Sequence, residues 1–397
     1  MTDLADPLAL RGAMPRERVA VSALFLANGY VVGSWAPKIP SFKAALGIDE
    51  ATLGLMILAF GAGSLITMPL VGVLVARDGS RRISIATGVA LAPLILLLTL
   101  MPGLWSAAVV LVFLGGLVGG MDVAMNANAV AVERRMRRAI MSSCHAWWSV
   151  GALIGAATGG LLIGSIGPLA HSVTVFVVAL GVVAAAAGSV LADPPPARQA
   201  GEKTRGLPGL LALLVGVMAL FSMIPEGAVL DWSALYLEQE LGGSVEAAGL
   251  AFAAFSATMA LMRFSGDIVR DRLGAVLTLR LSTLVAGTGL LAAAFAGSVW
   301  MAAAGFALAG LGIANMVPIA FSAAGNLPGL PPGVGISAVS FMGYSGLLFA
   351  PSLIGFIAQH TGLGPIWVGL PLLYVVVLAL SGLARHADPG AGLTATG

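Results

Sequence analysis

Apolar stretches long enough to cross a bilayer recur along almost the whole chain, separated by short polar or Gly/Pro-containing stretches. A helix needs about 20 apolar residues to span the hydrocarbon core. The pattern therefore predicts an all-α membrane protein with twelve transmembrane helices. The expected spans are Val19–Lys43, Thr52–Ala76, Ile83–Met101, Ser106–Val132, Ala139–Gly164, Ser172–Ala192, Gly209–Leu237, Ala247–Asp267, Val276–Ala296, Val299–Ala323, Val334–Ala358 and Pro365–Ala384.

Basic residues are distributed unevenly between the two sides of this predicted bundle. With twelve spans, both termini share one side, which also receives the loops after the even-numbered spans. Nearly all Lys and Arg residues fall on that side, whereas only Lys38 and Lys43 fall on the other. Arg263 and Arg280 are expected at helix ends that face the basic side. Because cytoplasmic loops carry the excess of Lys and Arg, both termini are predicted to be cytoplasmic.

The two halves of the chain repeat one another at an offset of 195 residues. The Gly-Leu pair at 54–55 and the Ala-Phe pair at 59–60 recur at 249–250 and 254–255, and Arg77 and Gly79 match Arg272 and Gly274. Since each copy keeps its arginine loop on the same side, each contains an even number of spans, and six fit. The halves are thus predicted to be parallel repeats. We expect a cytoplasmic tail at 1–18, six-helix bundles at 19–192 and 209–384, a cytoplasmic linker at 193–208 and a cytoplasmic tail at 385–397.

Composition excludes several other classes of protein. The chain is 58% hydrophobic and 10% charged, whereas soluble domains contain about 25% charged residues. A single cysteine excludes a disulfide framework, and neither a metal-ligand spacing, a phosphate-binding loop nor a nucleophile elbow is present. We expect no cofactor, no metal, no enzymatic activity and no nucleic-acid partner. The arginine run at 134–138 is interpreted as a topology and lipid determinant.

The loop after the second span resembles a family signature. It runs Gly72-Val-Leu-Val-Ala-Arg77-Asp78-Gly79-Ser-Arg81-Arg82, and a degenerate copy runs Gly266-Asp267-Ile-Val-Arg270-Asp271-Arg272-Leu-Gly274. Both resemble the signature loop of the major facilitator superfamily. The resemblance implies its twelve-helix fold, secondary transport by alternating access, and gating by these loops. The gating candidates it implies are Arg77, Asp78, Arg81, Asp271 and Arg272. Ala76 stands where an acidic residue is usual, so Asp78 or residues elsewhere would complete the first gate.

The fourth span carries a narrower resemblance. Asp122-Val-Ala-Met-Asn126 is similar to a stretch of the fucose-permease-like branch of bacterial inner-membrane permeases, in which the carboxylate takes part in proton-coupled sugar uptake. Only Asp122 and Asn126 carry over. The acidic residue that this branch uses in its first helix has no match here, because Asn28 and Ala36 occupy the region.

Three ionisable residues inside the predicted spans are candidates for proton coupling. A charged side chain at mid-membrane costs about 2.5–3.5 kcal/mol on insertion scales and marks a functional site by default. Asp122 shares a helix face with Gly115, Gly119 and Asn126, which could line a cavity where its carboxyl exchanges protons. Alternatively, Asp122 is a fixed structural partner of His145 or of an arginine. Glu226 follows Pro225 at an expected break in the seventh span; the alternative is a hinge whose carboxyl bonds nearby backbone. His145 titrates near neutral pH and could relay protons.

Several neutral polar and aromatic side chains are candidates for solute binding. Trp148 could stack on a flat ligand or belong to the interfacial aromatic belt. Hydrogen-bonding side chains could bind solute or join helices. The substrate-binding candidates are Asn28, Trp35, Asn126, Trp148, Asn315 and Tyr344.

Lys38 and Asp231 lie near the side opposite the termini, one in each half. They could pair as an outer gate, or remain two solvated helix ends. The predicted function is alternating-access transport of a small polar solute, with sugar-like compounds among the candidates, coupled to protons. The alternative is a proton-driven exporter of drugs or amphipathic metabolites; a membrane sensor without transport would need a soluble domain, which is not evident. The expected partners are the solute, protons and the bilayer, and we expect a monomer in the bacterial inner membrane.

Overall fold

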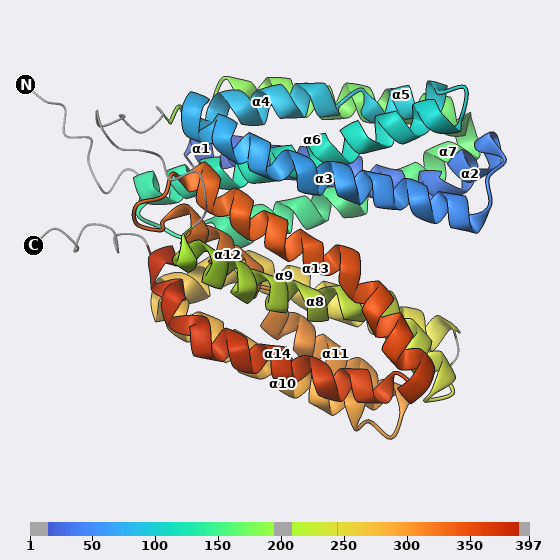
Figure 1. Cartoon of the computed structure of the whole chain (residues 1–397), viewed down its shortest axis with the longest axis vertical. Coiled ribbons are helices and arrows are strands. Elements are labelled where there is room, and N and C mark those ends of the chain that lie inside the picture. Colours follow the sequence, from blue (N-terminus) through green and yellow to red (C-terminus); the bar gives the residue numbers. More distant parts are fainter. Residues whose placement is uncertain (1–14, 194–208, 244, 389–397) are drawn as a thin grey trace, which may run out of the picture.

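The computed structural model describes residues 15–193, 209–243 and 245–388, in which the regular secondary structure is helical (Figure 1). The helices are α1 (Arg16–Trp35), η2 (Ala36–Lys38), α2 (Ile39–Leu46), α3 (Glu50–Asp78), α4 (Ser80–Leu91), α5 (Leu94–Leu100), α6 (Leu104–Met136), α7 (Met141–Ala187), α8 (Leu210–Gln239), α9 (Val245–Leu273), α10 (Ala275–Ala294), α11 (Val299–Ile313), α12 (Met316–Gly325), α13 (Pro332–Thr361), α14 (Gly364–Leu380) and η3 (Ser381–Ala387).

These helices make twelve crossings, as the hydropathy pattern predicts. The third crossing is α4 followed by α5, and the tenth is α11 followed by α12. Helix α7 contains the fifth and sixth crossings, two helical stretches that meet at a kink at Gly167, where the backbone is not helical and φ is 86°. In the described part of the chain, nine segments reach the length and hydropathy typical of a membrane span. The remaining three crossings are formed by α1, by α7 before Gly167 and by α9.

The crossings form two groups that meet on one side of the molecule. Figure 1 shows α1–α7 as a first helix group and α8–η3 as a second. The groups lie close together on the side where α1 begins and η3 ends, which we call the proximal side, and they diverge toward the distal side, where α2 lies. Large apolar side chains such as Leu55, Trp105 and Leu161 are exposed on the outer surface, as expected for helices that face lipid.

Glycines allow α1 and α7 to pack backbone against backbone. A Cβ atom added to Gly29 or to Gly33 would lie 2.0 Å from the carbonyl oxygen of Trp148 or of Ala152, respectively. Small residues at such positions permit close helix approach in membranes, where dispersion contacts replace the hydrophobic effect as the main attraction. This contact brings the polar residues of α1 and α7 to the centre of the first group.

The repeat is visible in how each half ends. Asp193, directly after the first group, accepts hydrogen bonds from the backbone N–H groups of Ser80 (3.0 Å) and Arg81 (3.1 Å) at the start of α4. Asp388, which lies 195 residues later, accepts a bond from the N–H of Ala275 (2.7 Å) at the start of α10. Each carboxylate satisfies unpaired helix N–H groups and complements the positive end of the helix dipole.

The expected break at Pro225 is not found. Helix α8 continues through Pro225 and Gly227 as one α-helix, because a proline removes a single backbone bond that surrounding helices can compensate. The interruptions occur instead at Pro93 between α4 and α5 and at Asn315 between α11 and α12.

Candidate functional site

A buried chain of polar side chains connects α6 with α7. The Asp122 side chain lies near the middle of α6 and is 4% exposed. Its Oδ1 accepts a hydrogen bond from Asn126 Nδ2 (3.1 Å), while its Oδ2 is buried without a hydrogen-bond partner among the described residues. Asn126 Oδ1 lies 3.3 Å from His145 Nε2, which makes the imidazole N–H the donor. Asp122 therefore contacts His145 through Asn126, and the amide that donates to it is uncharged.

A second polar chain links the two helix groups. Arg263 of α9 donates from Nη2 to Glu226 Oε1 of α8 (2.9 Å) and from Nη1 to Ser149 Oγ of α7 (2.9 Å). Its side chain is 8% exposed, and its Nε is buried without a partner in the described part of the chain. Ser149 Oγ donates in turn to the His145 carbonyl oxygen (3.1 Å). Glu226 is thus half of an ion pair within the second group, and Arg263 also reaches the first.

Tyr344 of α13 is close enough to both chains to interact with the carboxylates of Asp122 and Glu226. His145 further joins the groups through ring contacts with Phe25 of α1 (centroids 5.3 Å apart) and with Phe321 of α12 (5.6 Å). We call the connected set the central cluster. Its members are Asp122, Asn126, His145, Ser149, Glu226, Arg263 and Tyr344.

Asn28 holds Trp148 beside this cluster. Asn28 Nδ2 donates to the Val118 carbonyl oxygen (3.1 Å), and Asn28 Oδ1 accepts from Trp148 Nε1 (2.9 Å). Asn28 thereby joins α1, α6 and α7 and sets the orientation of the indole. These bonds occupy the side-chain carbonyl oxygen and one N–H of Asn28. In this conformation Asn28 therefore serves to orient Trp148 rather than to bind a solute directly.

Two other substrate-binding candidates make no hydrogen bond to the described members of the central cluster. Trp35 packs edge-to-face on Phe42 of α2 (centroids 5.3 Å apart) on the distal side. Asn315 is buried at the break between α11 and α12, and neither of its side-chain polar atoms is hydrogen-bonded to a described residue. It lies against Gly266 of α9, where an added Cβ would be 1.9 Å from Asn315 Oδ1.

A buried ion pair joins the groups on the proximal side. Glu133 of α6 pairs with Arg270 of α9 (3.0 Å), and their side chains are 3% and 1% exposed. Arg270 also donates to Ser322 Oγ of α12 (2.9 Å) and to the Ala387 carbonyl oxygen, while Ser322 donates to Glu133. A buried pair is tolerated where such additional bonds satisfy both charges.

Three carboxylates also bind the start of α7. Glu133 Oε1 accepts from the N–H groups of Ile140 (2.9 Å) and Met141 (3.1 Å). From the second group, Asp267 accepts from Ser142 (2.9 Å) and Ser143 (3.1 Å), and Asp271 accepts from the Ala139 N–H (2.9 Å) and the Arg138 Nε (3.2 Å). We call Glu133, Asp267, Arg270 and Asp271 the proximal latch, because together they hold α6 and α7 to α9.

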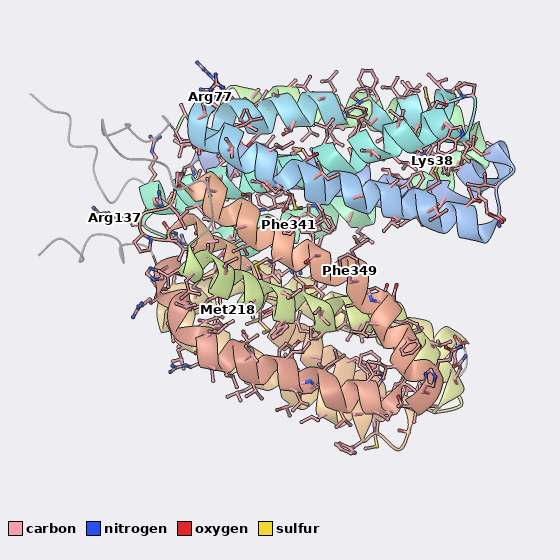
Figure 2. The ribbon with its side chains drawn as sticks, in the orientation of Figure 1. Lys38, Arg77, Arg137, Met218, Phe341 and Phe349 are labelled. Atoms are coloured by element: carbon pink, nitrogen blue, oxygen red, sulfur yellow. The ribbon has the colours of Figure 1, made fainter. Side chains whose placement is uncertain are left out.

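The first signature loop lies outside this latch. Arg77 is 76% exposed, and its ion-pair partner is the adjacent Asp78 (3.6 Å); Figure 2 shows it projecting from the outer edge of the molecule. The Arg81 side chain donates to the Ala187 carbonyl oxygen (3.1 Å). These contacts remain within the first helix group. Of the gating candidates in the signature loops, Asp271 joins the two groups, and Arg272 is exposed beside it.

Close packing explains why the first copy has no equivalent latch in the described structure. Gly72 occupies the position 195 residues before Asp267, and it faces the start of α13. A Cβ atom on Gly72 would lie 2.3 Å from Ser337 Oγ and 2.7 Å from the Gly333 carbonyl oxygen. An acidic side chain cannot fit there. The helices are joined at this position by direct contact, and at the repeat-related position by a carboxylate.

The expected pair of Lys38 with Asp231 does not form in this structure. Lys38 is buried near the distal end of the first group (Figure 2), where its Nζ donates to the Pro168 carbonyl oxygen (3.1 Å). Asp231 is exposed on α8. The two groups are separated on this side, so the geometry for an ion pair between these two described residues is absent.

Sequence reasoning missed Arg263, Glu133, Asp267 and Arg270. Arg263 was expected at a helix end, but α9 extends to Leu273 and places it deeper in the helix. The available signal was the density of charges between positions 263 and 272 in an otherwise apolar span. In the described part of the chain, no group of three or more His, Cys, Asp or Glu side chains could hold a metal ion.

Comparisons with known proteins agree with this architecture. An uncharacterized MFS-type transporter from Yersinia pestis is 35% identical over 368 residues, covering 91% of this chain and 94% of the relative. The membrane protein MosC from Rhizobium meliloti is 34% identical over 365 residues, covering 91% and 88%.

Among solved structures, a variant of the E. coli fucose:proton symporter FucP aligns with a TM-score of 0.74 and 16% identity, covering 92% of this chain and 98% of FucP. FucP in the outward conformation aligns with a TM-score of 0.73 and 17% identity, over the same shares. At these identities the likeness concerns the fold. The sequence profile of the Major Facilitator Superfamily matches residues 21–237. The chain therefore belongs to the Major Facilitator Superfamily, whose members are multi-pass membrane transporters and not enzymes.

Proposed function

We propose that this protein is a proton-coupled secondary transporter that carries a small polar solute across the bacterial inner membrane as a monomer. The observation that carries the proposal is the central cluster. Polar side chains of both helix groups meet there within the predicted spans, where ionisable groups are costly and mark ion or substrate pathways. Sugars and polyols are the first candidate solutes, because the cluster offers carboxylate, amide and hydroxyl groups beside the Trp148 indole.

We propose that the proximal side is cytoplasmic. The excess of Lys and Arg in the proximal loops supports this orientation. The two helix groups, taken as bundles over 19–192 and 209–384, would then be closed toward the cytoplasm by the proximal latch and separated toward the outside. Transport would require the latch to break as the bundles rock around the central cluster.

Solute and proton would be coupled through Asp122. The uncompensated Asp122 carboxylate is costly to bury as an anion, so protonation from the outside would favour rearrangement of the bundles. Release of the proton to the more alkaline cytoplasm would restore the anion. In this scheme Asn126 and His145 hold the carboxyl in position, and Trp148 contacts the solute.

The test is reconstitution into proteoliposomes. A pooled set of sugars and polyols is screened for binding by thermal shift. L-fucose is the first probe, because one structural neighbour is a fucose:proton symporter. Each stabilising compound is then assayed for uptake and for proton flux with an internal pH dye. We expect uptake to drive proton entry in wild type and Asp122→Asn to abolish it. Proton entry that persists undiminished in Asp122→Asn would refute the assignment. Trp105→Phe, an exposed surface change, is the control.

A further inference from the structure

The two carboxylates of the central cluster differ in what compensates their charge. Glu226 Oε1 accepts a hydrogen bond from the Arg263 guanidinium at 2.9 Å. Asp122 accepts from an uncharged amide, Asn126, and its Oδ2 is buried without a hydrogen-bond partner among the described residues. One carboxylate thus has a neighbouring positive charge, whereas the other has neutral hydrogen-bond donors.

This difference decides which group can release and take up a proton. An opposite charge within hydrogen-bonding distance favours the ionised form of a carboxylate, and burial without one favours the protonated form. Breaking a buried ion pair by neutralising one partner leaves the other charge uncompensated, which is strongly unfavourable. Protonating Glu226 would incur that cost, but protonating Asp122 would not.

The position of the ion pair in the fold supports the same division. Glu226 and Arg263 both belong to the second helix group, so their bond does not depend on the relative position of the two groups. The bond from Arg263 to Ser149 crosses to α7 and would break when the groups separate. The pair would therefore move with the second group as a neutral unit, while Asp122 moves with the first.

The other groups around the pair do not supply a replacement cation. On α7, His145 is hydrogen-bonded to Asn126 and not to Glu226. On α13 and α14, Tyr344 and Tyr374 are the neighbours of Glu226. On α9 itself, Asp267 is engaged by the start of α7. Arg263 is thus the compensating charge for Glu226 among the described neighbours.

We propose that Arg263 is a positioning residue that holds Glu226 in an ion pair and thereby assigns the exchanged proton to Asp122. The proposal rests on the proton coupling proposed above, and it adds which of two carboxylates titrates and what enforces the choice. If Arg263 loses its charge, Glu226 becomes a second titrating site.

The test observes carboxyl protonation without any solute. Difference infrared spectra of the purified full-length protein in lipid are recorded between alkaline and acidic buffer, and the carboxylic-acid C=O band is compared among variants. We expect Asp122→Asn to lose a band that Glu226→Gln retains. Arg263→Gln should gain one further band, and Arg263→Lys, which keeps the charge, should not. The double variant Glu226→Gln/Arg263→Gln should lose the gained band and keep the Asp122 band.

The double variant also separates the proposal from misfolding, because it removes both charges of the pair and leaves none uncompensated; monodispersity in detergent is checked for every variant. A wild-type band that disappears in Glu226→Gln, or the absence of a new band in folded Arg263→Gln, would overturn the assignment. Proton flux in proteoliposomes then tests the proposed function separately. Infrared results as expected without solute-driven proton flux would refute the coupling and leave the role of Arg263 standing.

Discussion

Replacing Asp267 by Asn should open the proximal side. Asp267 accepts two backbone N–H bonds, from Ser142 and Ser143, at the start of a helix in the other group. Asparagine keeps one acceptor oxygen but removes the charge. Hydrogen bonds to charged groups contribute about 1.5–3 kcal/mol, compared with about 0.5–1.5 kcal/mol for neutral ones, and a charge at a helix terminus adds up to about 2 kcal/mol. A loss of about 2 kcal/mol in the closed state corresponds to a roughly 30-fold larger open population.

The only cysteine in the chain provides the assay. Cys144 is buried directly after the two serines that Asp267 binds. Its Sγ lies 3.9 Å from Ser22 Oγ of α1, so its alkylation by a maleimide should report release of the start of α7 from the helices that cover it. We expect the labelling rate in Asp267→Asn to rise by about the factor of 30 derived above, in proportion to the open population.

A matched control exists within the first group. Asp193 binds two helix N–H groups with nearly the same geometry, at 3.0 and 3.1 Å, but both belong to α4. Asp193→Asn should lower thermal stability without exposing Cys144. If Asp267→Asn left the labelling rate unchanged, or if both variants raised it equally, the carboxylate would not hold the groups together.

Two further predictions concern the same interface. Glu133→Gln leaves Arg270 uncompensated and should destabilise the protein by about 3–5 kcal/mol, measured as a fall in the thermal unfolding midpoint. The control Glu17→Gln breaks the more exposed pair with Arg135 (3.1 Å) and should cost less than about 1 kcal/mol. Equal losses of stability in the two variants would refute this ranking of the two ion pairs. Gly72→Ala should force α3 and α13 apart, at a cost of about 1–3 kcal/mol, and should raise Cys144 labelling. Gly181→Ala is its control, because an added Cβ there meets nothing within 4 Å, and similar behaviour of the two variants would contradict the packing argument.

The crossings were predictable because each depends on local properties. A run of apolar residues long enough to span a bilayer has few alternatives to a helix, since every backbone polar group must be satisfied within the segment. The interruptions were less predictable. Pro225 lies inside a continuous helix, whereas the chain breaks at Pro93 and at Asn315. A proline removes one bond, and the packing around it determines whether the helix continues.

The candidate site shows the same limit. Asp122 and Glu226 stand out in sequence because charge in an apolar span is unusual. The partner of Glu226 was not apparent, because Arg263 is distant in sequence from both Glu226 and Ser149 and meets them only after α7, α8 and α9 pack together. The gate illustrates this further, since the loop with the clearer signature, around Arg77, is exposed and its degenerate copy contains Asp267 and Arg270 of the proximal latch.

The sequence by itself determined the membrane class, the number of crossings, the twofold repeat and which ionisable residues would be costly to bury, because hydropathy, spacing and charge are properties of single segments. Only the tertiary structure decided which of those charges are neutralised, since compensation requires a partner within a few ångströms. That is why, among the described residues, Glu226 has a guanidinium partner and Asp122 has an amide. It is also why one copy of the repeated loop binds a helix terminus and the other, at Gly72, has no room to do so.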